Sequence, residues 1–232
     1  MTSFFQWIGQ LARQTAAMVY KEMLTEWRMR VRVSGIFWFS VAIVMMVAFS
    51  IQSSTMLKEI AGGTLWIAIL LASTRSLDQS YQVEHEQGAM EGLLLWPVDP
   101  IAVYYGKAIA NMLVLLGVAL AVLPLLLAIY DRPMLGSWPQ LIGTIVLGCA
   151  AIAAPGTLLG LITSQARGSS VMLPLLLFPL VVPALLAASM STSRLMEGDP
   201  MNVAPPWMLV LVVVNCVFWS FPSVLYGLIF ED

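Results

Sequence analysis

Long stretches without a charged side chain constrain this 232-residue chain more than any other feature. They occupy residues 33–57, 60–74, 108–130, 133–166, 168–193 and 201–230. A helix that crosses the hydrocarbon core of a bilayer needs about 20 apolar residues. Five of the stretches meet this length. The second reaches it if its helix continues through Ser76 and Leu77 while Arg75 extends to the interface. The pattern predicts an all-α, polytopic membrane protein with six transmembrane helices.

The scarcity of charge excludes the soluble class of proteins. Only 10% of the residues are charged and 59% are hydrophobic, whereas soluble domains carry about 25% charged residues. So few charges cannot cover a water-facing surface. The longest polar interval has about 30 residues, well short of a typical soluble domain. We therefore expect a single domain over 1–232.

Cations are distributed unevenly over the segments that connect the expected spans. With the N-terminus inside, the inner segments hold Arg13, Lys21, Arg28, Arg30, Arg32, Arg75, Lys107 and Arg167. The outer loops hold Lys58, Arg132 and Arg194. Inner loops of membrane proteins are enriched in lysine and arginine. We expect both termini in the cytoplasm, with a cytoplasmic or interfacial segment over 1–32 and a six-helix membrane domain over 33–232.

The first 32 residues predict an amphipathic helix rather than a signal peptide, because no cation precedes their apolar residues and no long apolar core is present. The apolar side chains at helical spacing are Phe4, Ile8, Leu11, Thr15, Val19, Met23 and Trp27, joined by Phe5, Ala12 and Ala16. The charged side chains Arg13, Lys21, Glu22 and Glu26 fall largely elsewhere. Such a helix would lie in the membrane interface, held by the three following arginines at an anionic inner leaflet. The alternative is a helix packed on the end of the bundle.

The one long polar interval, residues 75–107, lies between the second and third expected spans. It contains the carboxylates Asp78, Glu84, Glu86, Glu91 and Asp99 and the single histidine, His85. Residues 82–96 can form an amphipathic helix that stops at Pro97. An anionic leaflet would repel the carboxylates, so a basic groove on a soluble protein is a better counterpart. We predict a cytoplasmic coupling helix whose contact residues are Glu84, Glu86, Gly88, Glu91 and Pro97. The alternative is a solvated connector.

Two expected spans carry unusual residues. In the fourth, Gly156 and Gly160 form a GxxxG pair, which permits close helix packing within one chain or between two. The fifth contains Pro174, Pro179 and Pro183. Prolines free backbone carbonyls that neighbours or a polar cavity must satisfy. A broken helix of this kind is common in transport pathways, and a kinked helix that only shapes the bundle is an equal alternative.

No constellation for catalysis or for a metal is visible in the sequence. The ATP-binding pattern GxxxxGK[ST] is absent, since Gly106-Lys107 is followed by alanine. The expected spans contain almost no ionisable residues, which disfavours a proton relay or an intramembrane hydrolase. We expect Cys149 and Cys216 to be packing residues, and His85 to be solvated rather than a haem ligand. Energy for uphill movement would come from another chain.

Three sequence stretches and the six-span layout resemble the heme exporter protein B family of the cytochrome c maturation system, an ABC-2-type permease family. The stretches are KEMLTEWRMR at 21–30, EQGAMEGLLLWPVDPIAVYYGK at 86–107 and APGTLLGLITSQARGSSVMLPLLLFPLVVPALLA at 154–187. The likeness covers the chain from about residue 18 to its end, and the first 17 or so residues look like an extension. It implies one ABC-2-type transmembrane domain without catalytic residues.

The resemblance also implies partners and a location. It implies a cytoplasmic ABC ATPase, a second copy of the permease and further cytochrome c maturation proteins in a bacterial inner membrane, with no nucleic acid. ATP would act only through the partner, and haem would be a possible cargo rather than a firmly bound cofactor. Arg75, Lys107 or Arg167 could receive haem propionates, or could simply anchor helix ends. Permeases for other lipophilic cargo, and a membrane scaffold that transports nothing, are the alternatives.

Overall fold

The computed structural model describes residues 2–28, 30–86, 99–131, 137–164, 169–199 and 201–229. These residues form helices and no strand, which confirms the prediction of an all-α protein. The helices are α1 (Thr2–Arg28), α2 (Arg30–Ser50), α3 (Ser54–Glu59), α4 (Ala61–Glu86), α6 (Pro100–Ile129), α7 (Trp138–Ser164), α8 (Ser169–Met196) and α9 (Ala204–Ile229).

Five of the described helices are long and apolar enough to cross a membrane. Their candidate spans are Val33–Ser50, Ile101–Ile129, Trp138–Thr163, Met172–Met196 and Ala204–Phe221. The second expected span appears as a shorter apolar segment, Ala61–Leu77, at the start of α4. Its end coincides with the predicted extension through Ser76 and Leu77.

One predicted boundary is wrong because a polar residue caps a helix earlier than expected. The first span ends at Ser50, as expected within one residue, and α3 begins after Ser53, whose side chain accepts a hydrogen bond from the Met56 N–H at 3.5 Å. The third helix begins at Pro100 rather than near Ala108. There the Asp99 carboxylate accepts the Ile101 N–H at 3.0 Å and proline occupies the first turn, a favoured helix start.

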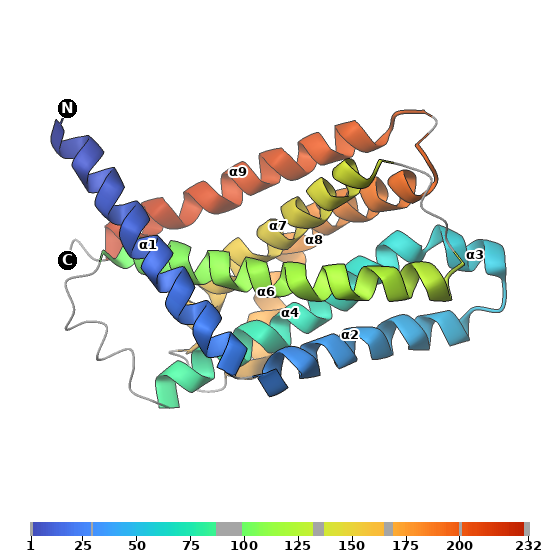
Figure 1. The fold of residues 1–232 in the computed structure, drawn as a ribbon, viewed down its shortest axis with the longest axis horizontal. Coiled ribbons are helices and arrows are strands. Elements are labelled where there is room, and N and C mark those ends of the chain that lie inside the picture. The colour runs from blue at the N-terminus through green and yellow to red at the C-terminus, as the bar shows by residue number, and fades with distance from the viewer. Residues whose placement is uncertain are drawn as a thin grey trace.

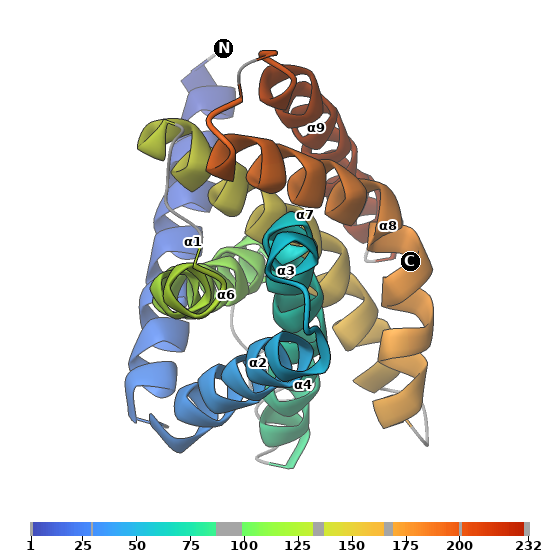
Figure 2. The same cartoon turned by 90° about the vertical axis from the view of Figure 1, so that its right-hand side faces the viewer.

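The long helices lie side by side along one direction, with α4 in the middle of the bundle (Figures 1 and 2). Helix α4 packs against α2, α6, α7 and α8. Helix α1 crosses α6 at one end, whereas α3 lies at the opposite end (Figure 1). The start of α1 and the end of α9 lie at the same end of the bundle.

Trp66 anchors the core on α4. Its indole is fully buried and donates its Nε1–H to the Thr192 hydroxyl of α8 at 3.0 Å. The ring lies against Gly148 of α7, where a Cβ would overlap the ring atoms. The absence of a side chain at Gly148 therefore allows α7 to approach α4.

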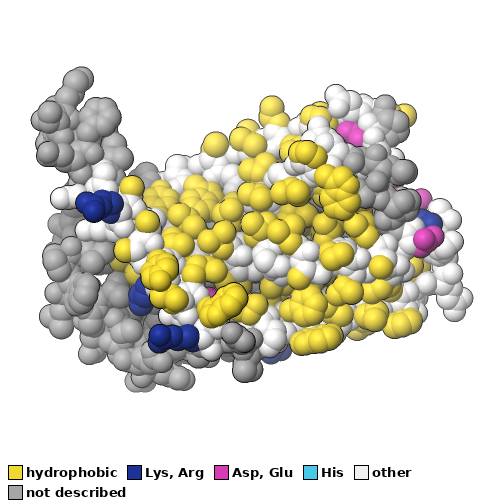
Figure 3. Space-filling model, viewed as in Figure 1, with side chains coloured by type: hydrophobic (Ala, Val, Ile, Leu, Met, Phe, Trp, Pro, Cys, Tyr) yellow, Lys and Arg dark blue, Asp and Glu magenta, His cyan; other side chains and the backbone are white. Residues whose placement is uncertain are grey.

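The outer surface of the bundle is hydrophobic along its length. Phe49 is 83% exposed, and Trp38, Met46, Leu175 and Leu209 are exposed as well. In Figure 3 hydrophobic side chains cover the middle of the visible face, while charged side chains show towards its two ends. This distribution suits helices whose outer sides face lipid.

Candidate functional site

Helix α1 holds the start of α6, immediately after residues 87–98 of the polar interval. The Gln14 amide oxygen accepts the backbone N–H of Asp99 at 3.3 Å. One turn later Met18 packs so closely on Gly106 that a Cβ there would lie 2.5 Å from the Met18 Cβ. Helix α1 packs against α6 and α2, an arrangement that agrees with the alternative of a helix packed on the bundle. Its place in the membrane interface stays a prediction.

The side of α1 that packs against the bundle carries two carboxylates near its C-terminal end. Glu22 and Glu26 are only 8% and 7% exposed, whereas Trp27 is 71% exposed. The packed side follows Leu11, Thr15, Met18, Glu22 and Glu26, because these positions recur at the spacing that faces α6. Buried carboxylates are costly in an apolar setting, so their presence here marks a specialised region.

The predicted coupling residues fall into two groups, those within α4 and those that follow its end. Glu84 and Glu86 belong to the last turns of this helix, which runs without a break from the core to Glu86. Gly88, Glu91 and Pro97 lie outside the described residues, as does most of the expected helix over 82–96. The polar interval thus joins the central helix α4 directly to α6.

The cations predicted for the inner side, Arg75, Lys107 and Arg167, do not share one environment. The Arg75 guanidinium is exposed and lies 5.3 Å from the ring centre of Phe39 on α2. Lys107 on α6 is only 5% exposed, while Arg167 and His85 fall outside the residues whose side chains are described. Arg75 therefore lies near the end of the apolar segment Ala61–Leu77 but within α4, where it could meet an anionic group. Lys107 contributes to packing beside Gly106, on which α1 packs.

Polar contacts join α6, α7 and α9 inside the apolar bundle. Asn111 donates its amide N–H to the Thr157 hydroxyl at 3.0 Å, and the Tyr104 hydroxyl donates to the Ala154 carbonyl at 2.9 Å. The Tyr105 hydroxyl donates to the Trp219 carbonyl at 2.9 Å, and the two rings stack. The sequence analysis missed this set, although an asparagine within an apolar run is itself a signal of an inward-facing position.

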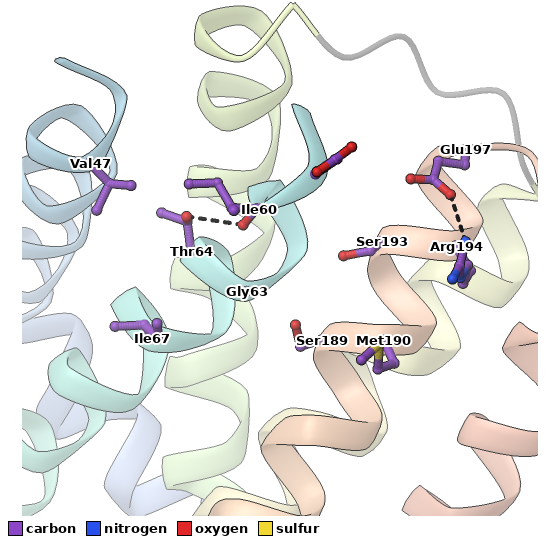
Figure 4. Close-up of a pocket in the computed structure, with 11 residues that line it drawn as sticks. Val47, Ile60, Gly63, Thr64, Ile67, Ser189, Met190, Ser193, Arg194 and Glu197 are labelled. Atoms are coloured by element: carbon purple, nitrogen blue, oxygen red, sulfur yellow. Dashed lines mark hydrogen bonds and ion pairs between the residues drawn. The ribbon is translucent and has the colours of Figure 1, made fainter. Parts of the chain in front are cut away.

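A pocket of about 680 Å³ opens at the opposite end of the bundle between α2, α4 and α8 (Figure 4). Ser189 and Ser193 of α8 face Gly63 of α4, and the Thr64 hydroxyl donates to the Ile60 carbonyl at 3.1 Å. At the rim, Arg194 pairs with Glu197 at 3.2 Å. Glu59 also lines the pocket, and Val47, Ile67 and Met190 supply apolar walls. Such a pocket suits one end of an amphipathic molecule.

Helix α8 remains a single helix through all three of its prolines. Pro179 and Pro183 are exposed, and Pro174 is half-buried. Of the two alternatives for this span, the continuous backbone agrees with a helix that only shapes the bundle rather than with a broken helix. The functional role of the prolines stays a prediction.

The glycine pair of α7 packs within the chain. A Cβ on Gly156 would lie 2.5 Å from a terminal methyl group of Leu77 on α4, and Gly160 is buried. The two cysteines lie on different helices, Cys149 buried on α7 and Cys216 exposed on α9. Among the described residues, no three histidine, cysteine or acidic side chains are grouped as a metal site requires.

Helices of this length and apolar character, bundled with hydrophobic side chains outward, define a multi-pass membrane protein. A family model described as CcmB protein matches residues 13–224. The chain belongs to the CcmB protein family, which confirms the resemblance seen in its sequence motifs.

Several curated relatives are named Heme exporter protein B. The chain is 30% identical to the one from Rhodobacter capsulatus over 181 residues, which cover 76% of this chain and 83% of the relative. It is 30% identical to the Paracoccus denitrificans protein over 147 residues, covering 63% and 67%. The Pseudomonas aeruginosa protein is 26% identical over 168 residues, covering 72% and 75%.

Proposed function

We propose that this chain is the permease subunit of an ABC-type haem exporter of cytochrome c maturation. The observation that carries the proposal is the family match over 13–224, together with relatives named Heme exporter protein B. The chain has no ATP-binding P-loop, so a separate cytoplasmic ABC ATPase would hydrolyse ATP. Haem is then cargo rather than a firmly held cofactor. The energy drives haem transfer, or release of a haem-loaded chaperone, on the periplasmic side.

The proposal includes six spans in a bacterial inner membrane, with both termini in the cytoplasm. Helix α4 supplies the sixth span. Its apolar part has 17 residues, about 25 Å at 1.5 Å per residue, somewhat short of a hydrocarbon core of about 30 Å. However, Leu65, Trp66 and Ile69 are fully buried, so neighbouring helices rather than lipid surround it. A shielded helix can cross with fewer apolar residues and can tolerate its buried Ser73 and Ser76.

The polar interval is the proposed place of contact with the ATPase. It lies between α4, which packs on the long helices α2, α6, α7 and α8, and α6, whose start is held by Gln14 of α1. If the ATPase displaces this interval, the displacement would reach the centre of the bundle through α4 and would reach α1 through α6. Where packed helices have two stable arrangements, a local displacement is converted into a rearrangement of helices. A second copy of the chain completes the proposed transporter.

Co-purification tests the proposal. The full chain is expressed with the genes that neighbour it, extracted from membranes and captured through a tag. We expect a nucleotide-binding subunit to be retained, and membranes containing both subunits to support production of c-type cytochromes. Failure to retain any nucleotide-binding subunit would contradict the permease assignment.

A scaffold that only holds a haem-handling complex together is the second candidate. The observation that favours it is the continuity of α8, whose Pro179 and Pro183 lie on its exposed side instead of lining a cavity. A permease for another lipophilic cargo would share the architecture and the ATPase. It would retain the nucleotide-binding subunit but would leave c-type cytochrome production unchanged when deleted.

A further inference from the structure

A second cavity of about 680 Å³ lies on the side of the bundle where α1, α2 and α6 meet. Its walls are apolar and include Phe37 of α2 and Leu113 and Val118 of α6. We call it the lateral groove. Its wall at Gly117 is open, because a Cβ there would meet no other atom within 4 Å. The end near α1 carries Glu26 and Trp27.

The position of the lateral groove defines the kind of molecule it can hold. Two of its walls belong to candidate membrane spans, Val33–Ser50 and Ile101–Ile129. It therefore opens on the side of the bundle that lipid surrounds. Figure 3 looks onto the face shared by α1, α2 and α6, where hydrophobic side chains predominate and basic side chains show near α1. An occupant needs an apolar chain for the walls and a polar head for the α1 end.

The charged residue at the α1 end of the lateral groove determines which polar headgroup the occupant can carry. Glu26 is 7% exposed, so its carboxylate lines the groove from within. A buried carboxylate favours an ammonium group that can donate hydrogen bonds, and it repels an anionic head.

We propose that the lateral groove binds one phospholipid of the bilayer whose headgroup carries a primary ammonium group. Its acyl chain occupies the space beside Gly117, and its ammonium group meets Glu26. The carboxylate makes the groove unsuitable for an anionic cargo such as a porphyrin with two propionates, so the lipid site is separate from the cargo route. The inference does not depend on the proposed function, since it rests on the groove alone.

Native mass spectrometry of the purified full chain tests the proposal. The protein in mild detergent is incubated with equal amounts of phosphatidylethanolamine and phosphatidylglycerol, and the retained lipids are counted. We expect the wild type to retain one phosphatidylethanolamine in preference to phosphatidylglycerol. Glu26→Gln should lower this preference about tenfold, which corresponds to about 1.4 kcal/mol, close to the contribution of one hydrogen bond to a charged group. Glu22→Gln is the matched control, because Glu22 is equally buried on α1 but does not line the groove.

A second pair of variants tests the acyl-chain part of the groove. Gly117→Leu adds a side chain whose Cβ meets no other atom, so the protein should fold, and its larger side chain should lower the retention of both lipids by a similar factor. Gly35→Leu is its control, because a Cβ at Gly35 also meets nothing and Gly35 does not line the groove. Unchanged lipid preference in Glu26→Gln would overturn the proposal, as would an equal loss in Glu22→Gln. Dissociation of a dimer by Gly117→Leu with lipid retention unchanged would assign the groove to a second copy instead.

Discussion

At the scale of single residues, close approach of helices depends on glycines that accept a large side chain. Gly148→Ala should lower the free energy of unfolding by about 1–3 kcal/mol, because the new methyl group overlaps the Trp66 ring. The ring cannot move freely, since its N–H is bonded to Thr192. Gly35→Ala is the control: it meets no atom and should be neutral or slightly stabilising. Denaturation in mixed micelles measures both, and equal stabilities would refute the packing argument.

The sequence predicts the burial and contacts of some residues but not of others, and the difference has a physical reason. An apolar run predicts burial in lipid or protein without saying which, so the contact of Trp66 with Gly148 could not be read from it. The buried Glu22 and Glu26 were assigned elsewhere because charged residues normally avoid the packed side of a helix. Asn111 was visible in its run, and polar residues within spans usually face the bundle interior.

At the scale of helix pairs, the contact between α6 and α7 should show measurable coupling. In a double-mutant cycle, Asn111→Ala and Thr157→Val remove the two partners of the 3.0 Å hydrogen bond singly and together. We expect a coupling energy of about 0.6 kcal/mol, and at most about 1.7, as for other hydrogen bonds between membrane helices. The cycle is completed by measuring, in mixed micelles, the unfolding free energies of the wild type, the two single variants and the double variant. Strict additivity would mean that the bond contributes nothing specific.

Pro179→Ala separates the two candidate functions at the level of one helix. The side chain is exposed and α8 is continuous, so the variant should insert and accumulate like the wild type. If α8 must bend during the transport cycle, removing the proline stiffens it, and we expect fewer c-type cytochromes at equal abundance. Haem staining of membranes beside an immunoblot of the chain gives both readouts. Full activity would instead favour the scaffold.

Most helices could be predicted from the sequence as elements, because uncharged runs of this length have few other structures available in a bilayer. Their ends depended on capping. The early start of α6 follows from Asp99 and Pro100. Hydropathy also underestimates α4 as a membrane span. A helix surrounded by other helices carries hydroxyl side chains that a helix facing lipid would avoid.

At the scale of the whole molecule, the arrangement of α4, the polar interval and α6 leads to a prediction about assembly. Glu91 lies in this interval, outside the described residues, and belongs to the acidic side of the predicted coupling helix. Glu91→Lys places like charges together if the ATPase presents a basic residue there. The change should weaken association by about 2–5 kcal/mol for a buried contact, and by far less at a rim.

The expected phenotype is a normally abundant permease that no longer retains the ATPase or supports c-type cytochromes. Insertion should survive, because an added cation in an inner loop agrees with the distribution of lysine and arginine in membrane proteins. Glu59→Lys makes the same charge change at the opposite end of the bundle and should leave ATPase retention intact. Pull-downs and immunoblots of the three membranes provide the comparison. If Glu91→Lys retained the ATPase at the wild-type level, this side of the interval would be a solvated connector. Loss of the permease itself would show that Glu91 stabilises the fold.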